Sequence, residues 1–161
     1  ETVLLLIVPL FMLLSDFGLL DNRLGLILVY AAFNTPFCIL LMRGFFANIP
    51  GELQESAEID GCSPLGAFRR ILLPLSLPGL AATFVFAFIS AWNELLFAVM
   101  MLNAEARKTI TVGLASFIEK YNISWGLMSA GTVIALIPML ILFGFVLKYL
   151  ASGLSAGAVK G

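Results

Sequence analysis

Long apolar runs separated by short polar segments are the feature that most constrains how this chain can fold. Three runs, at about residues 24–46, 75–102 and 127–150, are each long enough to cross roughly 30 Å of hydrocarbon as a helix. The run at residues 1–14 falls short of the ~20 residues that a spanning helix needs, so we interpret it as part of a further transmembrane helix. Only 12% of the 161 residues are charged, against about 25% in soluble domains. These observations predict an all-α, polytopic bundle of transmembrane helices.

The composition also argues against several classes of function. A net charge of −1 gives no electrostatic reason to expect nucleic acid. The chain has no histidine, and so lacks the commonest metal ligand and the usual general base. The two cysteines, Cys38 and Cys62, are too few for a disulfide framework. The phosphate-binding pattern G-x-x-x-x-G-K-[ST] does not occur either. We therefore expect no enzyme, no metal site and no directly bound cofactor, and any ATP hydrolysis would belong to another subunit.

The polar segments alternate between the two sides of the predicted bundle. Residues 51–73 and the tail at 151–161 are expected on one side, and the turn at 15–24 and the loop at 103–126 on the other. We expect the loop to contain a short surface helix and the tail to be flexible. Basic residues number five on the first side and four on the second, which is a weak indication that residues 51–73 are cytoplasmic.

Residues 51–73 form a densely charged elbow in which two short helices are expected to meet at a sharp corner. Gly61 occupies the position of a left-handed C-terminal cap, Ser63 offers an N-cap hydroxyl, and Pro64 falls at the first helical position. Pro74 and Pro78 are expected to set the angle at which the chain leaves the elbow. A charged loop between membrane helices is commonly just solvated, and the alternative is a docking surface for another protein.

The spacing within the elbow is specific. Glu55-Ser56-Ala57 is followed after three residues by Gly61, and after nine more by the run I-L-L-P that ends at Pro74. This resembles the E-A-A-x-x-x-G-x9-I-x-L-P signature of binding-protein-dependent ABC importer permeases, with Ser56 in place of the first alanine. Further segments resemble the carbohydrate-uptake, maltose-type members: Phe45-Phe46, Ile49-Pro50, Asp60-Gly61, Pro74-Leu75, Trp92-Asn93-Glu94, Thr109, Val112-Gly113-Leu114, Trp125-Gly126 and Gly157-Ala158-Val159-Lys160-Gly161.

The resemblance covers nearly the whole chain and implies a multi-pass subunit of the inner (plasma) membrane, matching the C-terminal portion of such permeases. Its implied partners are a second homologous permease, a dimeric ATP-binding subunit that supplies ATP and Mg, an extracytoplasmic sugar-binding protein that meets the loop at 103–126, and the lipid bilayer. It also implies a cytoplasmic elbow that contacts the ATPase subunit through Glu52, Glu55, Ser56, Ala57, Asp60, Gly61, Arg69 and Arg70. The closing residues Ala158 and Lys160 are expected to reach the same subunit.

Helical spacing assigns roles to the apolar residues of the elbow. Leu53 and Ala57, four positions apart, are expected to form a small apolar ridge that docks on the partner. Phe68, Ile71, Leu72 and Leu75 share one helical face, which we expect to anchor the second helix on the bundle.

Two polar groups within the apolar runs are candidates for a substrate path. Asn34 and Thr35 precede Pro36, and they either satisfy the carbonyl groups freed by a proline kink or line the path. Trp92, Asn93 and Glu94 combine a ring face, an amide and a carboxylate, which suit sugar hydroxyl groups; the alternative is an interfacial tryptophan and a glutamate that holds a helix end.

Two other functions remain open from the residues alone. A secondary transporter or channel would use Glu94 and the broken helices to carry ions or protons. A structural membrane anchor would use the elbow only to recruit a partner. The spacing of the elbow motif favours the ATP-driven sugar importer over both.

Overall fold

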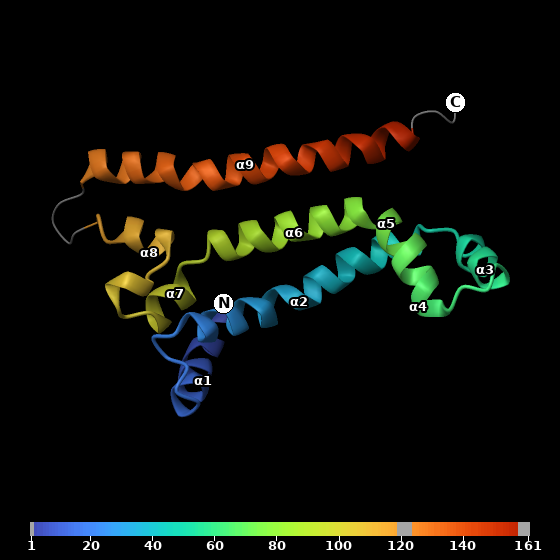
Figure 1. Cartoon of the computed structure of the whole chain (residues 1–161). Helices are drawn as coiled ribbons and strands as arrows, with labels where there is room; N and C mark the ends of the chain where they lie inside the picture. Colours follow the sequence, from blue (N-terminus) through green and yellow to red (C-terminus); the bar gives the residue numbers. More distant parts are fainter. Residues whose placement is uncertain (1, 119–123, 158–161) are drawn as a thin grey trace. The chain divides into compact units, whose positions relative to one another are not determined.

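The computed structural model describes residues 2–118 and 124–157, and its regular elements are helices, as predicted (Figure 1). The chain divides into two compact units. The first unit consists of Glu1–Asn34 and Ile89–Met139, and the second of Thr35–Phe88 and Leu140–Gly161. The helices are α1 (Thr2–Asp16), α2 (Arg23–Ala47), α3 (Glu52–Ile59), α4 (Pro64–Ala67), the π-helix η1 (Phe68–Leu72), α5 (Leu73–Leu75), α6 (Leu77–Trp92), α7 (Leu96–Met101), the 3-10 helix η2 (Glu105–Arg107), α8 (Ile110–Ala115) and α9 (Trp125–Gly157).

Within the described residues, two helices are long and apolar enough to cross a membrane: α2, and α9 over Trp125–Leu147. A third span results if Pro64–Leu75 and α6 are counted together, although they meet at a bend of 69°. The bend falls at Ser76, between Pro74 and Pro78, where the sequence predicted a change of direction. The apolar part of α1, Leu5–Asp16, is shorter than a span.

Two helix boundaries differ from the prediction. The run at 75–102 is not one helix, because α6 ends at Trp92 and α7 begins at Leu96. At the other end of the chain, α9 continues to Gly157, past the predicted boundary at residue 150. No proline follows residue 150 to stop it, and extending an existing helix needs no new nucleus.

The first unit is built around the short helix α7. Phe97, Ala98 and Met101 of α7 and the following Leu102 are all buried. They pack with buried residues of three other helices: Ile7 and Leu14 on α1, Leu26 and Val29 on α2, and Val112 on α8. The short surface helix expected in the loop at 103–126 is present as α8, but its Val112 is buried in this core.

In the second unit, the C-terminal half of α2 packs closely on the start of α6. The rings of Phe37 and Phe86 lie with their centroids 4.1 Å apart. At Gly79 the approach is closer still, since a Cβ atom there would lie 2.4 Å from Cγ of Phe45. This contact was not predicted, because a glycine within an apolar run does not show which neighbour approaches it.

Candidate functional site

The corner of the elbow is made by a left-handed glycine. Gly61 has φ +81°, its amide donates to the carbonyl of Glu58 at 3.0 Å, and the amide of Cys62 donates to the carbonyl of Ala57 at 2.9 Å. This pair of bonds is the Schellman motif, which satisfies the free carbonyl groups at the end of α3. The predicted C-terminal cap is confirmed. Nothing lies within 4 Å of a Cβ placed at Gly61, so the backbone conformation, and not lack of space, calls for glycine here.

The second helix of the elbow starts where the sequence predicted. The hydroxyl of Ser63 accepts a hydrogen bond from the amide of Gly66 at 3.2 Å, and Pro64 occupies the first turn of α4. The two caps are separated by only Cys62, so the chain reverses sharply with both helix ends satisfied. Figure 1 shows α3 and α4 meeting at this corner.

The predicted apolar ridge on α3 is wrong in one member. Ala57 is only 4% exposed, because it faces inward in the packing of α3 on α4 and η1. Leu53 remains exposed at 40%, and the most exposed apolar side chain of the elbow is Ile59 at 86%, which the sequence analysis did not single out. Ser56 is exposed and its hydroxyl donates to the carbonyl of Glu52 at 2.7 Å.

The predicted anchoring face is only partly formed by contacts within the chain. The ring of Phe68 lies 6.3 Å from that of Phe46 on α2, centroid to centroid. Ile71 and Leu72 are partly buried, whereas Leu75 is 51% exposed. The helix widens to a π-turn at Phe68–Leu72, immediately before Pro74. Proline cannot donate to the carbonyl four residues earlier and its ring crowds that carbonyl, which accounts for the wider turn.

The charged side chains of the elbow face outward. The acidic residues Glu52, Glu55 and Asp60 on or next to α3, and the basic residues Arg69 and Arg70 on η1, are all exposed. None of them forms an ion pair within residues 2–118 and 124–157. The elbow therefore presents an acidic helix and a basic pair to its surroundings.

The two candidates before Pro36 differ in exposure, since Asn34 is partly buried. Asn34 donates from Nδ2 to the carbonyl of Tyr30, one turn earlier, at 2.8 Å. The carbonyl group that Pro36 leaves without its amide donor is that of Ala32, four residues earlier, so this bond does not decide between the two alternatives. Thr35 is exposed. A role of either residue in a substrate path stays a prediction.

Glu94 lies in the break between α6 and α7, and its side chain is partly buried. Its Oε1 accepts from the amide of Phe97 at 2.9 Å, and its Oε2 accepts from the Tyr30 hydroxyl at 2.8 Å and from the amide of Ala98 at 3.2 Å. The Thr111 hydroxyl donates to the backbone carbonyl of Glu94 at 2.8 Å. This geometry favours the alternative in which Glu94 holds a helix end.

The neighbours of Glu94 are arranged differently. Asn93 is exposed, and its amide group donates to the carbonyl of Ile89 at 2.9 Å. The Trp92 side chain is partly buried at the end of α6. The assignment of both residues to a substrate path also stays a prediction.

A cluster around Asp21 was missed by the sequence analysis. Asp21 adopts φ +51°, and its Oδ1 accepts from the amides of Asn103 at 3.0 Å and Ala104 at 2.9 Å. Its Oδ2 pairs with Arg107 at 2.9 Å. The amide of Ala104, with those of Asn103 and the Arg107 guanidinium, lowers the pKa of this carboxyl below its ordinary value of 3.8. The turn at 15–24 and the loop at 103–126 are thus joined directly.

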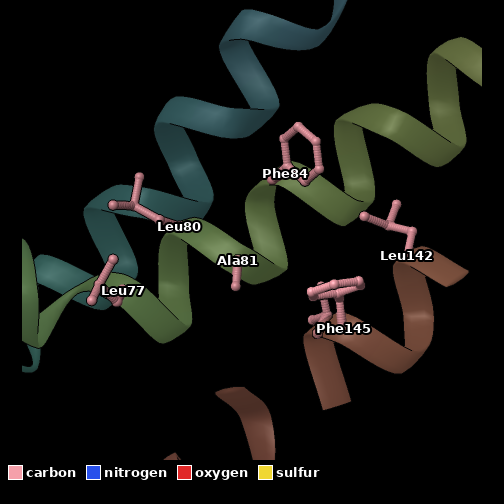
Figure 2. A pocket seen from close by; sticks show the side chains of 7 residues that line it. Leu77, Leu80, Ala81, Phe84, Leu142 and Phe145 are labelled. Atoms are coloured by element: carbon pink, nitrogen blue, oxygen red, sulfur yellow. The ribbon is translucent and has the colours of Figure 1, made fainter. Parts of the chain in front are cut away.

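An apolar groove lies in the second unit. Its volume is about 470 Å³, and it is lined on α6 by Leu77, Leu80, Ala81 and Phe84 and on α9 by Leu142, Phe145 and Val146. Figure 2 shows the labelled side chains of both helices around it. A groove without a polar side chain offers nothing to a sugar hydroxyl group, and its apolar lining suits a hydrocarbon environment.

Two further expectations concern a tail and a metal. Ala158 and Lys160 lie outside the described residues. Within the described part of the chain, no three Cys, Asp or Glu side chains are grouped so that they could hold a metal ion.

Residues 2–156 match the model of a protein family described as "Binding-protein-dependent transport system inner membrane component". The chain is 43% identical over 157 residues to the Diacetylchitobiose uptake system permease protein DasC of Streptomyces coelicolor, covering 97% of this chain and 56% of that protein. It is 39% identical over 155 residues to the Probable ABC transporter permease protein YurM of Bacillus subtilis, covering 96% of this chain and 52% of that protein. It is 36% identical over 158 residues to the Trehalose transport system permease protein SugB of Mycobacterium tuberculosis, covering 97% of this chain and 58% of that protein.

The structure is similar to one chain in a crystal structure of a bacterial ABC transporter involved in the import of the acidic polysaccharide alginate. The TM-score is 0.68 at 32% sequence identity, with 88% of this chain and 55% of that chain covered. The chain spans about half the length of the curated relatives that it matches.

Proposed function

The chain belongs to the family of binding-protein-dependent transport system inner membrane components, and from this we propose that it is the permease subunit of an ATP-driven sugar importer. The family is one of membrane transport components, and the apolar helices α2 and α9 suit that setting. In this proposal the chain contributes to the translocation path and hydrolyses nothing itself. ATP and Mg are bound by a separate, dimeric ATPase subunit, and sugar is delivered by an extracytoplasmic binding protein. A second, homologous permease completes the path.

The doubly capped corner of the elbow is the observation that best supports a coupling role. Gly61 and Ser63 fix the angle between α3 and α4 through backbone bonds, so the elbow can move as one piece. Its exposed residues include seven of the eight that the resemblance assigns to the ATPase contact: Glu52, Glu55, Ser56, Asp60, Gly61, Arg69 and Arg70. Ile59 adds an exposed apolar side chain to this surface. Ala57 supports the corner from inside.

Coupling also requires that motion at the elbow reach the membrane helices. In the second unit, α3 follows α2 after only a short turn, and η1 leads through α5 into α6. Phe68 contacts Phe46 on α2, so the elbow is packed on the same helix that leads into it. An ATPase that binds the elbow differently in its open and closed states would therefore bias the positions of α2 and α6.

The substrate path is the less supported part of the proposal. We place Asn34, Thr35, Trp92 and Asn93 along it, because an amide and an aromatic ring are the groups that bind sugar hydroxyls and ring faces. The relatives named for diacetylchitobiose and trehalose make these two sugars the first probes.

Reconstitution with its partners tests the proposal. The natural protein is produced with the second permease, the ATPase subunit and the binding protein, and is placed in proteoliposomes with diacetylchitobiose or trehalose outside. We expect the sugar-loaded binding protein to stimulate ATP hydrolysis and uptake to require ATP inside. Uptake driven by an ion gradient without ATP would establish the secondary transporter instead. Binding of the ATPase subunit with no stimulation and no uptake of any sugar in a wider panel would establish a structural anchor.

A further inference from the structure

The break between α6 and α7 has a chemical problem that Glu94 solves. The first amides of any helix lack partners within the helix, and in hydrocarbon there is no water to satisfy them. The amides of Phe97 and Ala98, in the first turn of α7, both donate to the carboxylate of Glu94, at 2.9 and 3.2 Å. Both residues are buried in the core of the first unit. The core therefore depends on an acceptor at this point in the chain.

The carboxylate is also tied to a second helix. The hydroxyl of Tyr30 on α2 donates to Oε2 of Glu94 at 2.8 Å. Close by, the ring of Phe33 on α2 lies 5.1 Å from the ring of Phe97, centroid to centroid. The carboxylate thus fixes the start of α7 against one face of α2.

The backbone of Glu94 reaches a third segment. The Thr111 hydroxyl, on α8, donates to the Glu94 carbonyl at 2.8 Å and is itself 2.9 Å from the hydroxyl of Thr109. Helices α2, α7 and α8 therefore meet at this one residue.

We propose, taking the proposed transport function as given, that Glu94 is a positioning residue that locks the α6–α7 break to α2 and α8 and does not bind the sugar. A carboxylate has about four lone-pair sites, and three are occupied by donors of the chain itself. One site, on Oε1 beside the amide of Phe97, stays open, and a sugar hydroxyl that displaced Tyr30 or either amide would leave an unsatisfied group in the core. Tyr30 acts through Glu94 and has no separate role in this lock.

Amide exchange in the assembled transporter tests the lock without a sugar. The complex is placed in lipid nanodiscs, and hydrogen–deuterium exchange is measured in peptides covering residues 95–102. In Glu94→Gln, an NH2 group replaces one acceptor oxygen, and in either orientation it faces at least one backbone amide that is itself a donor, so we expect exchange to rise about tenfold. Tyr30→Phe removes only the hydroxyl and should raise exchange about threefold. Because Tyr30 acts through Glu94, the double variant should match Glu94→Gln alone.

Asn93→Ala is the matched control, since within the described residues the Asn93 side chain bonds to the carbonyl of Ile89, in its own turn. It should leave exchange at residues 95–102 unchanged. An equal rise of exchange in Asn93→Ala and Glu94→Gln would show general loosening of this region and refute the lock. The lock would also be refuted if the rises of exchange caused by Tyr30→Phe and Glu94→Gln multiplied in the double variant, because the two residues would then act independently. If Glu94→Gln does not insert into the membrane, Tyr30→Phe decides, and unchanged exchange in that variant refutes the proposal.

An uptake measurement separates positioning from sugar contact. The sugar is diacetylchitobiose or trehalose, whichever the wild-type transporter takes up. Glu94→Gln should lower the maximal rate of uptake about tenfold, and Tyr30→Phe should lower it about threefold. The half-saturation concentration should stay unchanged in both variants. Direct contact would instead raise the half-saturation concentration in Glu94→Gln and leave Tyr30→Phe normal, which would refute the proposal. If the wild-type protein takes up neither sugar, the proposed substrates are wrong, and the exchange experiment still decides the lock.

Discussion

Replacing Gly61 should uncouple ATP hydrolysis from transport, because the corner of the elbow needs a left-handed residue. A Cβ at this position would meet nothing within 4 Å, so the penalty comes from φ +81° alone. That conformation costs an L-residue about 1–2 kcal/mol, and a β-branched residue up to about 3 kcal/mol. At about 1.4 kcal/mol per factor of ten, Gly61→Ala should open the corner about 5–30-fold more often, and Gly61→Val more often still. Asparagine tolerates this region, so Gly61→Asn should stay near wild type.

The assay compares ATP hydrolysis with sugar uptake in proteoliposomes that hold the assembled transporter. We expect Gly61→Val to retain basal hydrolysis and to lose most of its uptake, with Gly61→Ala in between. Gly51 provides the matched control, since it also has open space around it but lies at φ −61°. The same added methyl group in Gly51→Ala should leave both rates unchanged. Exchange of the amides of Gly61 and Cys62, which close the Schellman motif, reports the opening of the corner directly.

Two results would refute this reasoning. If Gly61→Ala behaves like Gly51→Ala, the left-handed conformation is not what the position requires. If sugar uptake by Gly61→Asn is as impaired as that by Gly61→Val, the partner requires a position without a side chain, and the conformation of the corner is secondary.

Three other contacts give predictions. Gly79→Ala places a methyl group 2.4 Å from Cγ of Phe45, so overpacking should outweigh the better helix propensity and cost about 1 kcal/mol of stability. Thermal unfolding in detergent measures this loss. In a Phe45→Ala background, which lacks the ring, Gly79→Ala should no longer destabilise the protein; an equal loss in both backgrounds would argue against the clash. Ser63→Ala removes the N-terminal cap of α4 and should lower the local stability of this helix by about 1 kcal/mol. Amide exchange in the first turn of α4 should therefore become faster, and unchanged exchange would mean that the cap is not needed. The pKa of Asp21 is lowered in the folded state, so its stabilising effect is complete above its ordinary pKa of 3.8 and is lost as pH falls below that value. Asp21→Asn should abolish this pH dependence and weaken the attachment to Arg107 only slightly, since the pair is exposed. Amide exchange at residues 102–108 between pH 3 and 6 measures the effect. If the wild-type protein and Asp21→Asn show the same dependence on pH, Asp21 is not its source.

The elbow was predictable because its determinants are local. A glycine that must adopt positive φ, a capping serine and a proline in the first turn each act within a few residues, so Gly61, Ser63 and Pro64 could be assigned roles from their order in the sequence. The motif spacing and the apolar runs likewise indicated the family and the all-α fold. Lengths and spacings of this kind are properties of the chain itself.

The remaining features depend on contacts between residues distant in the sequence, and only the tertiary structure decided them. Tyr30 and Glu94 are 64 positions apart, and Asp21 and Ala104 are 83 apart. No periodicity in either segment indicates which residue will lie opposite. The inward orientation of Ala57 depends on how α3 packs on α4 and η1, and the break after Trp92 is held through Glu94 by Tyr30 and Thr111. The sequence by itself determined the all-α class, the corner and the membrane setting, while packing decided where the third apolar run breaks and which polar groups pair.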